Sequence, residues 1–359
     1  MTIEFPTESW KDYALIDCGD GQKLERFGNV VMSRPEPKAL WTPSMPASEW
    51  SKMAWTNFRP SAGFGKAGKE DTGTWQMLRQ MDEQWYIRYA GEGSGEPAGG
   101  VDGSQARTAG PAGSPRFSLR LGLTAFKHVG VFPEQAQNWE YIYRQVRRLI
   151  EGTAPDKQAE DRNNSPSGPG TGAGIPRPKV LNLFAYTGAA SLAAACAGAE
   201  VTHLDSVRQV VNWASGNASA SRLEGLHWVV EDAMKFARRE AKRGHRYQGI
   251  ILDPPAYGHG PDGEKWKLDE CLFEMLRTVN EILEPRDSFM VLNLYSNGYS
   301  PLLGETVVRE ALGLGAGPDK PGKKQNGSQT PYSLESGELA LRDSFGKALP
   351  LSIFVRLAR

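Results

Sequence analysis

The sequence predicts an α/β protein in which a small β-rich N-terminal domain precedes a Rossmann-like, seven-stranded sheet with an antiparallel last strand. From residue 179 onward, apolar strand patterns alternate with helical patterns, which is the order of a parallel sheet with crossover helices. The last two strand patterns are separated only by residues 343–350, a hairpin length, so one of them must run antiparallel. Earlier in the chain, apolar residues alternate with turn-forming residues, which is typical of short strands.

Length and composition narrow the class of protein. The 359 residues exceed the roughly 100 to 200 residues of one domain, so two domains are expected. Lys plus Arg and Asp plus Glu are each 42, so any nucleic-acid surface must be a local patch. The 3 cysteines are too few and too far apart for a disulfide framework or a metal site, and they fit a reducing compartment. Without a signal segment or an apolar run of ~20 residues, the sequence predicts a soluble cytoplasmic protein with no membrane or metal partner.

Three segments rich in Gly, Pro, Ser and Ala divide the chain. We predict a β-rich domain over residues 1–152, with strands near 13–17, 29–33, 84–89 and 116–121 and an apolar helix pattern over 139–150. The segment near 91–115 is predicted to be a disordered insertion, because it cannot bury enough apolar surface to offset its ordering entropy. Residues 153–178 are predicted to be a flexible linker, and residues 313–331 a similar interruption. The second domain is then predicted to span 179–359.

Seven strands are predicted in the second domain. They cover residues 180–184, 200–205, 227–231, 249–253, 289–294, 338–342 and 351–357. The helices between the early strands are rich in alanine, as in 189–197. The carboxyl ends of parallel strands meet at one edge of a sheet, so residues that follow these strands are the candidates for a site.

The first such candidate is the stretch after the strand 180–184. Asn182, Phe184, Ala185, Tyr186, Thr187 and Gly188 are the candidate cofactor-binding residues there. In this stretch a strand end, a turn and a helix start allow backbone amides to approach a ligand. The single glycine argues against a dinucleotide, whose pyrophosphate needs a GxGxxG turn, whereas methionine and ribose need less clearance. A purely structural strand-to-helix turn is the alternative.

Two further candidates follow the next two strands. Asp205, with Ser206, comes 17 residues after Gly188, the usual place for a carboxylate that accepts both ribose hydroxyls. Asp232, with Ala233, follows the third strand, where an acceptor for an adenine amino group is needed. Each aspartate could instead be the N-cap of the helix that follows it.

The fourth strand leads into Asp253-Pro254-Pro255-Ala256-Tyr257. Two consecutive prolines after a buried strand fix an extended turn and hold the nearby carbonyls rigidly. In methyl transfer to an exocyclic amine, an acceptor polarises the amine while an aromatic side chain stacks on the base. We therefore predict Asp253, Pro254, Pro255 and Tyr257 as catalytic residues, with Asp253 also contacting S-adenosylmethionine. Tyr257 could instead pack in a core, and residues 258–263 are predicted to form a flexible loop that closes over a substrate.

On these motifs the chain resembles the class I S-adenosylmethionine-dependent methyltransferases related to the bacterial large-subunit ribosomal RNA methyltransferases. The resemblance is carried by NLFAYTGAASLAAA, THLDSVRQVVNWA, VVEDAMKF and GIILDPPAYGHGPDGEKW. It implies that Asp205 holds ribose, that Asp232 lies near adenine and that Pro254 and Pro255 frame the transferred methyl group. It also implies that the segment 126–135 lines the cofactor pocket, which adds Phe132 and Gln135 to the site.

The resemblance favours a base of ribosomal or other structured RNA as the acceptor. Relatives that methylate carbon 5 of cytosine need a thiolate nucleophile, commonly just after the fifth strand, and residues 293–296 contain no cysteine. A nitrogen is therefore the favoured target. A small molecule or a protein side chain is the alternative acceptor, and it fits the zero net charge. A nicotinamide-dependent oxidoreductase and a non-catalytic RNA-binding protein are weaker alternatives, and the oligomeric state stays open.

Overall fold

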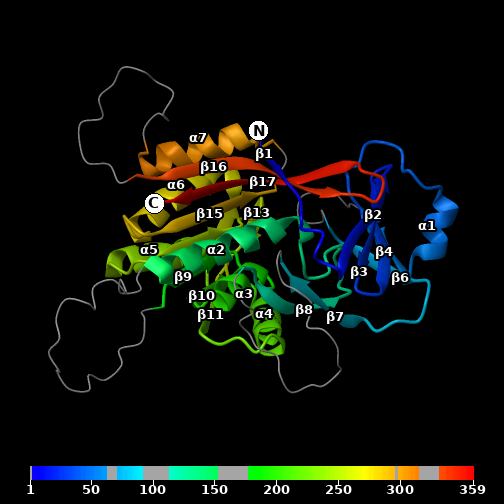
Figure 1. Ribbon diagram of the computed structural model, residues 1–359, viewed down its shortest axis with the longest axis horizontal. Helices are drawn as coiled ribbons and strands as arrows, with labels where there is room; N and C mark the ends of the chain where they lie inside the picture. The colour runs from blue at the N-terminus through cyan, green and yellow to red at the C-terminus, as the bar shows by residue number, and fades with distance from the viewer. Residues whose placement is uncertain (1, 63–70, 92–112, 153–176, 296–297, 315–330) are drawn as a thin grey trace, which may run out of the picture.

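The computed structural model describes residues 2–62, 71–91, 113–152, 177–295, 298–314 and 331–359. Its largest element is an eight-stranded sheet in the order β1-β16-β17-β15-β12-β9-β10-β11 (Figure 1). The strands are Thr2–Glu4 (β1), Lys179–Leu183 (β9), Glu200–Asp205 (β10), Leu226–Val230 (β11), Gly249–Leu252 (β12), Phe289–Leu294 (β15), Ser333–Arg342 (β16) and Ala348–Ala358 (β17). β17 runs antiparallel to both of its neighbours, and the other pairings are parallel. The predicted fold class and its seven strands are confirmed, and β1 is an eighth strand.

Helices cover both faces of this sheet. Their bounds are Ala136–Gly152 (α2), Ala189–Cys196 (α3), Arg208–Ala220 (α4), Ala233–Arg243 (α5), Leu268–Ile282 (α6) and Pro301–Leu312 (α7). Successive residues of a strand point to opposite faces, so Val180 packs with α2 and α3, whereas Leu181 packs with α5, α6 and α7. In β12, Ile251 packs on the face of α2 and α3, and Ile250 packs on the face of α5, α6 and α7. The near-continuous apolar strands of the sequence are therefore explained by burial on both sides.

The N-terminal part contains a five-stranded sheet and a two-stranded one. The first consists of Tyr13–Gly19 (β2), Gln22–Phe27 (β3), Val30–Pro35 (β4), Thr56–Pro60 (β5) and Gly73–Met77 (β6), with the short helix Ala47–Met53 (α1) beside it. The second pairs Gln84–Ala90 (β7) with Arg116–Gly122 (β8). The sequence analysis missed β3, β5 and β6.

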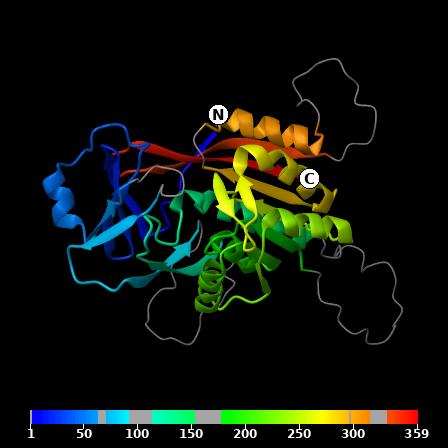
Figure 2. The same ribbon diagram turned by 180° about the vertical axis from the view of Figure 1, so that it is seen from behind.

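The two parts of the chain share one aromatic core. Trp10 lies 5.1 Å from Tyr89 and 5.7 Å from Trp139 of α2, measured between ring centroids. Leu341 and Leu349, from the end of the β16–β17 hairpin, belong to the same buried cluster. Figures 1 and 2 show this hairpin reaching from the large sheet toward β2 and β4. The large sheet is therefore packed directly against the N-terminal strands.

The boundaries at 152 and 179, which separate the β-rich domain from the second domain, remain a prediction. β1 pairs with β16, so the first strand of the chain belongs to the large sheet and not to the N-terminal sheets. Most of the predicted insertion near 91–115, of the linker 153–178 and of the segment 313–331 lies outside the described residues. The predicted flexible loop over 258–263 is wrong in part, because Tyr257–His259 (β13) pairs with Lys265–Lys267 (β14) in a hairpin.

Neither a membrane-spanning helix nor a metal-binding cluster is found among the described residues. No helix among them is long and apolar enough to cross a membrane. They also contain no group of three or more His, Cys, Asp or Glu side chains that could hold a metal ion. The three cysteines are free, and burial raises the pKa of both Cys18 and Cys196 to about 11, so these two thiols stay protonated at neutral pH.

Candidate active site

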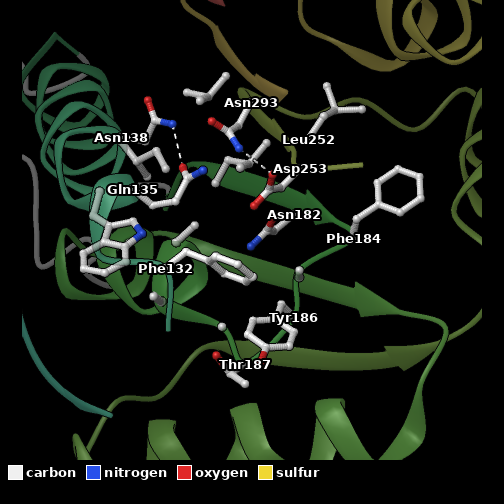
Figure 3. Close-up of a pocket in the computed structure, with 18 of the residues that line it drawn as sticks. Phe132, Gln135, Asn138, Asn182, Phe184, Tyr186, Thr187, Leu252, Asp253 and Asn293 are labelled. Carbon is white, nitrogen blue, oxygen red and sulfur yellow. Dashed lines mark hydrogen bonds between the residues drawn. The ribbon is translucent and has the colours of Figure 1, made fainter. Parts of the chain in front are cut away.

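The candidate site lies where the strand order of the large sheet reverses. From β9 the chain continues to β10 and β11 on one side, and then crosses over to β12 and β15 on the other. Beside such a switch point the two flanking loops diverge and leave a crevice at the carboxyl ends of the strands. A cavity of about 50 Å³ lies here (Figure 3). It is lined by Val131, Phe132, Gln135, Asn138, Trp139, Ile142, Asn182, Phe184, Ala185, Tyr186, Thr187, Gly188, Ala189, Ala190, Ile251, Leu252, Asp253, Val291 and Asn293.

The loop after β9 has an unusual backbone. Phe184, Tyr186 and Gly188 all have positive φ, at 58°, 48° and 93°. Bulky residues rarely adopt this conformation, and where they do the strain often marks a functional site. At Gly188 a side chain would also be crowded, because a Cβ there would lie 3.0 Å from the Cβ of Ala214. The loop therefore turns tightly into α3 and leaves its backbone close to the cavity.

Hydrogen bonds hold this loop to the segments around it. The Tyr186 amide donates to Asp205 Oδ2 at 3.0 Å, which joins the loop to the end of β10. The Thr187 hydroxyl donates to the Gly130 carbonyl at 2.6 Å, and the Asn217 side chain of α4 donates to the Thr187 carbonyl at 2.9 Å. The loop is thereby fixed to the segment that carries Phe132 and Gln135.

Asp253 follows β12 and is the only charged side chain among the residues that line the cavity. Its Oδ1 accepts a 2.7 Å hydrogen bond from Asn293 Nδ2 of the neighbouring strand β15. Burial raises the pKa of Asp253 to about 7, while the Asn293 bond opposes that rise. Asn293 Oδ1 is buried and has no partner among the described residues. A ligand with a cation or an N–H donor would satisfy both side chains.

A tryptophan of β14, the strand that leads into α6, holds the Pro254-Pro255 turn. Trp266 of β14 is buried and donates from its indole Nε1 to the Pro255 carbonyl at 2.7 Å. The Trp266 ring also packs against Phe184, with 4.7 Å between the ring centroids. In Figure 3 the Phe184 ring points away from the other labelled side chains. The two loops that flank the cavity are therefore braced against each other by Trp266.

Most of the predicted site residues come together in this cavity. Phe132, Gln135, Asn182, Phe184, Ala185, Tyr186, Thr187, Gly188 and Asp253 line it. Asp205, Ser206, Asp232, Ala233, Pro254, Pro255 and Tyr257 do not. The Asp205 carboxylate accepts from the amides of Tyr186 and Val207, both at 3.0 Å, and therefore touches the loop without reaching the cavity. Asp232 caps α5 by accepting from the Lys235 amide at 2.8 Å.

Tyr257 lies apart from the cavity, on the β13–β14 hairpin. Its side chain is 46% exposed, and its hydroxyl lies 3.0 Å from His259 Nε2. The alternative, that Tyr257 packs in a core, is wrong, because the hairpin carries the side chain into solvent. Its predicted stacking on a base is untested.

Sequence reasoning missed Asn138, Trp139 and Asn293 as lining residues. Asn293 carried a signal, because it is a single amide in the otherwise apolar strand Phe289–Leu294 and lies next to its carboxyl end. Asn138 is buried and donates to Gln135 Oε1 at 2.8 Å, which orients the predicted glutamine. Its position three residues after Gln135, on the same face of the coming helix, was the available signal.

Comparison with known proteins identifies the family. The chain is 32% identical to the SAM-dependent methyltransferase of Agrobacterium tumefaciens, whose crystal structure superposes with a TM-score of 0.73 over 99% of this chain and 93% of that one. The chain belongs to the S-adenosylmethionine-dependent methyltransferases. A methyltransferase structure from Streptococcus mutans shares the fold, with a TM-score of 0.58 and 14% identity over 97% of this chain and 75% of that one. The family's cofactor is S-adenosylmethionine.

A family model and two curated relatives match part of the chain. The family model described as "Conserved hypothetical protein 95" matches residues 170–284. The large-subunit ribosomal RNA methyltransferase K/L of Shewanella frigidimarina is 32% identical over 179 residues, which are 49% of this chain and 21% of that protein. Its counterpart in Pseudoalteromonas atlantica is 26% identical over 178 residues, again 49% and 21%. The chain thus spans about a fifth of the length of these curated relatives.

The residues around the cavity fit S-adenosylmethionine. The cofactor carries a positive charge on sulfur and a second on its α-ammonium group, and the cavity offers one half-buried carboxylate among neutral side chains. Phe132 and Tyr186, with 5.4 Å between their ring centroids, give aromatic surface for an adenosine. Nucleotide-sized ligands need roughly 300 Å³ or more, so side chains around the cavity of about 50 Å³ must shift when the cofactor enters.

Proposed function

We propose that this protein transfers the methyl group of S-adenosylmethionine to a base of structured RNA, with ribosomal RNA as the favoured acceptor. The observation that carries the proposal is the match, over 49% of the chain, to the large-subunit ribosomal RNA methyltransferases. The whole-chain similarity to a methyltransferase supports the reaction, and the cavity at the switch point supports the place of the cofactor.

We assign the cofactor to the loop after β9 and to Asp253. When bound, S-adenosylmethionine supplies an electrophilic methyl group on a positively charged sulfur. The Asp253 carboxylate balances a positive charge of the cofactor, and Asn293 holds that carboxylate in place. The loop after β9 would hold the methionine part, and Phe132 and Tyr186 would provide aromatic surface for the adenosine.

Asp205 and Asp232 remain our candidates for the ribose hydroxyls and the adenine amino group. Asp205 ends β10, and Asp232 directly precedes α5. Both follow strands on the β10–β11 side of the switch point. A carboxylate oxygen has two lone pairs, so the amide bonds that Asp205 already accepts leave room for a hydroxyl donor. The widening that admits the cofactor would expose these carboxylates to it.

A nitrogen is the proposed target atom. Carbon 5 of a pyrimidine needs a nucleophile such as a thiolate to add to the ring before it can accept a methyl group, whereas an amine attacks with its own lone pair. None of the three cysteines lines the cavity. Asn293 occupies the end of β15, and its amide is engaged with Asp253.

The direct test is transfer of radiolabelled methyl groups from S-adenosylmethionine into total RNA from a strain that lacks the gene. We expect label in RNA of one size class, with nuclease digestion to nucleosides giving a methylated exocyclic or ring nitrogen. Asp253→Asn should abolish most transfer, and the exposed Asp287→Asn should not.

Three outcomes decide between the acceptors. Label in RNA supports the proposal. Cofactor binding by calorimetry without label in RNA would contradict it and favour a small-molecule or protein acceptor. Label on carbon 5 of a pyrimidine would contradict the nitrogen assignment alone.

A further inference from the structure

A second cavity adjoins the first. It has a volume of about 190 Å³ and lies between the N-terminal strands and the carboxyl edge of the large sheet. Its lining residues are Lys23, Arg34, Pro35, Glu36, Pro37, Lys38, Lys127, His128, Phe132, Pro133, Glu134, Tyr295 and Leu351. Phe132 lines both cavities, so a molecule in the second cavity would lie next to the cofactor.

Aromatic rings form the boundary between the two cavities. Phe132 and Tyr295 are nearly parallel, with 6.3 Å between the ring centroids and 21° between the ring planes. Tyr295 comes two residues after Asn293, and 39% of it is exposed. Exposed ring faces beside a cavity are what a nucleobase stacks on. This wall therefore suits a planar ring.

The lining is positively charged overall. Lys23, Arg34, Lys38 and Lys127 are opposed in the lining only by Glu36 and Glu134. Arg34 is already paired with Glu25, Lys127 with Asp71, and Lys23 with both Glu25 and Glu36. Lys38 forms no ion pair with any described residue, and its Nζ donates to the Leu351 carbonyl at 2.6 Å. Its charge is thus left for an anion such as a phosphate.

Glu134 gives the cavity a buried acceptor. The residue is 6% exposed and lines the cavity, and its carboxylate accepts a hydrogen bond from its own backbone amide and is favoured by the charge of Lys23. Burial raises the pKa of Glu134, and the nearby carboxylates of Glu25 and Glu36 add to that rise. Burial of a carboxylate is costly, and an N–H group on a ligand would offset part of that cost by donating to a remaining lone pair.

The cavity size suits one base and not a whole nucleotide. An engineered protein cavity of about 150 Å³ is known to hold a benzene ring. The second cavity, at about 190 Å³, offers somewhat more space. A ribose and its phosphate would therefore lie at the opening, where half-buried Lys38 and Lys127 are the cations.

We propose that the second cavity receives the acceptor base of the RNA, extruded from its stack, with Glu134 accepting from an N–H of the base and Lys38 contacting the adjacent phosphate. Enzymes that modify a base in structured RNA must first remove it from the stack, and a pocket beside the cofactor is required for this. This inference rests on the proposed RNA methyltransferase function.

Two variants test the proposal in the full-length protein. Glu134→Gln keeps the shape but weakens the acceptor, and Lys38→Gln keeps a donor for the Leu351 carbonyl but loses the charge. Lys242→Gln, on the exposed face of α5, is the matched control. Each protein is checked for folding by circular dichroism and for cofactor affinity by calorimetry. Transfer to total RNA then gives kcat/KM, and filter retention of in vitro transcribed large-subunit ribosomal RNA gives affinity across a salt series.

We expect Glu134→Gln to lower kcat/KM for RNA by about tenfold or more with cofactor affinity within about twofold of wild type. Lys38→Gln should weaken RNA retention and reduce the slope of log affinity against log salt by about one. If wild type methylates RNA and both variants match Lys242→Gln, the second cavity does not hold the base and the proposed function survives. If wild type transfers no label to RNA, the proposed function fails and the inference fails with it.

Discussion

The Asn293 side-chain amide donates a 2.7 Å hydrogen bond to the Asp253 carboxylate, which links the ends of two neighbouring parallel strands. Asp253 follows β12, and Asn293 lies next to the end of β15. The bond fixes the carboxylate beneath the cavity and favours its ionised form against the effect of burial. A group with a pKa of about 7 changes charge within the physiological range, so its role can be measured by pH.

Cofactor affinity should rise as the pH rises from about 6 to about 7.5. The positively charged cofactor binds the ionised carboxylate of Asp253, whose pKa is about 7 in the free protein. Below that pKa binding must release a proton, and affinity should fall by up to about tenfold per pH unit. Above about pH 8 the α-amino group of the cofactor loses its own charge, which sets the upper limit. Calorimetry in two buffers of different ionisation enthalpy would count the released proton.

Asp253→Asn is the control for this titration. The variant should bind the cofactor more weakly near pH 7.5, and its affinity should not rise between about pH 6 and about pH 7.5. A wild-type affinity that stays constant over this range would argue against an ion pair between Asp253 and the cofactor.

Asp253 should also make the free protein less stable at high pH. The folded pKa of about 7 lies above the ordinary aspartate pKa of 3.8, so the protonated group's contribution to stability is complete at low pH and is lost as the pH rises through about 7. Asp253→Asn should therefore stabilise the protein more at about pH 8 than at about pH 5, by roughly 1–4 kcal/mol. Urea unfolding at the two pH values measures the difference. An equal gain for the exposed Asp287→Asn would show that the effect is not specific.

The buried pair of Glu25 and Arg34 should behave in the opposite way. Arg34 Nε lies 2.6 Å from the Glu25 carboxylate, and both side chains are almost fully buried. Arg34 and Lys23 lower the pKa of Glu25 to about 2 despite its burial. Its contribution to stability is then present above the unfolded pKa of about 4.5 and is lost as the pH falls through about 2.

Glu25→Gln should therefore cost about 3–5 kcal/mol of unfolding free energy at pH 7, because it leaves a buried arginine unpaired. The cost should shrink as the pH approaches about 2. Glu49→Gln, which breaks an exposed pair with Lys52, should cost less than about 1 kcal/mol. Similar costs for the two variants in urea unfolding at pH 7 would contradict the assignment of a buried pair.

Gly188→Ala tests the geometry of the loop after β9. The glycine has a φ of 93°, and a Cβ would lie 3.0 Å from Ala214 Cβ and 3.4 Å from His203 Cε1. We expect a loss of about 1–3 kcal/mol of stability and weaker cofactor binding, because the loop backbone must move. Gly216→Ala in α4, where a Cβ meets nothing within 4 Å, should instead be neutral or stabilising by up to about 1 kcal/mol. Unfolding and cofactor titration of both variants would reveal any departure from this contrast.

The sequence patterns predicted the large sheet well because its strands are apolar and lie in regular order. The strand β3, Gln22–Phe27, escaped prediction because its Lys23 and Glu25 are buried, and no local pattern shows that Glu25 pairs with both Lys23 and Arg34. β1 escaped because its partner β16 lies at the other end of the chain. Burial of charge and pairing between distant segments depend on tertiary structure, which overrides local propensity.

The residues of the candidate site also fall into those that local sequence predicts and those that only tertiary packing brings together. The loop 182–188 and Asp253 were predicted because the carboxyl ends of parallel strands converge on one edge. Asn138 and Trp139 lie on α2, which precedes β9 in sequence, so only the packing of α2 brings them to the cavity. The second cavity could not be predicted either, because its walls come from β3, β4, the segment before α2 and the end of the large sheet.

A crystal structure with S-adenosylhomocysteine would test the central claim about the cofactor most directly. The account predicts the ligand at the switch point beside β9, with its amino group within hydrogen-bonding distance of the Asp253 carboxylate and its adenosine beside Phe132 and Tyr186. A ligand bound elsewhere, or one with its carboxylate facing Asp253, would contradict the account.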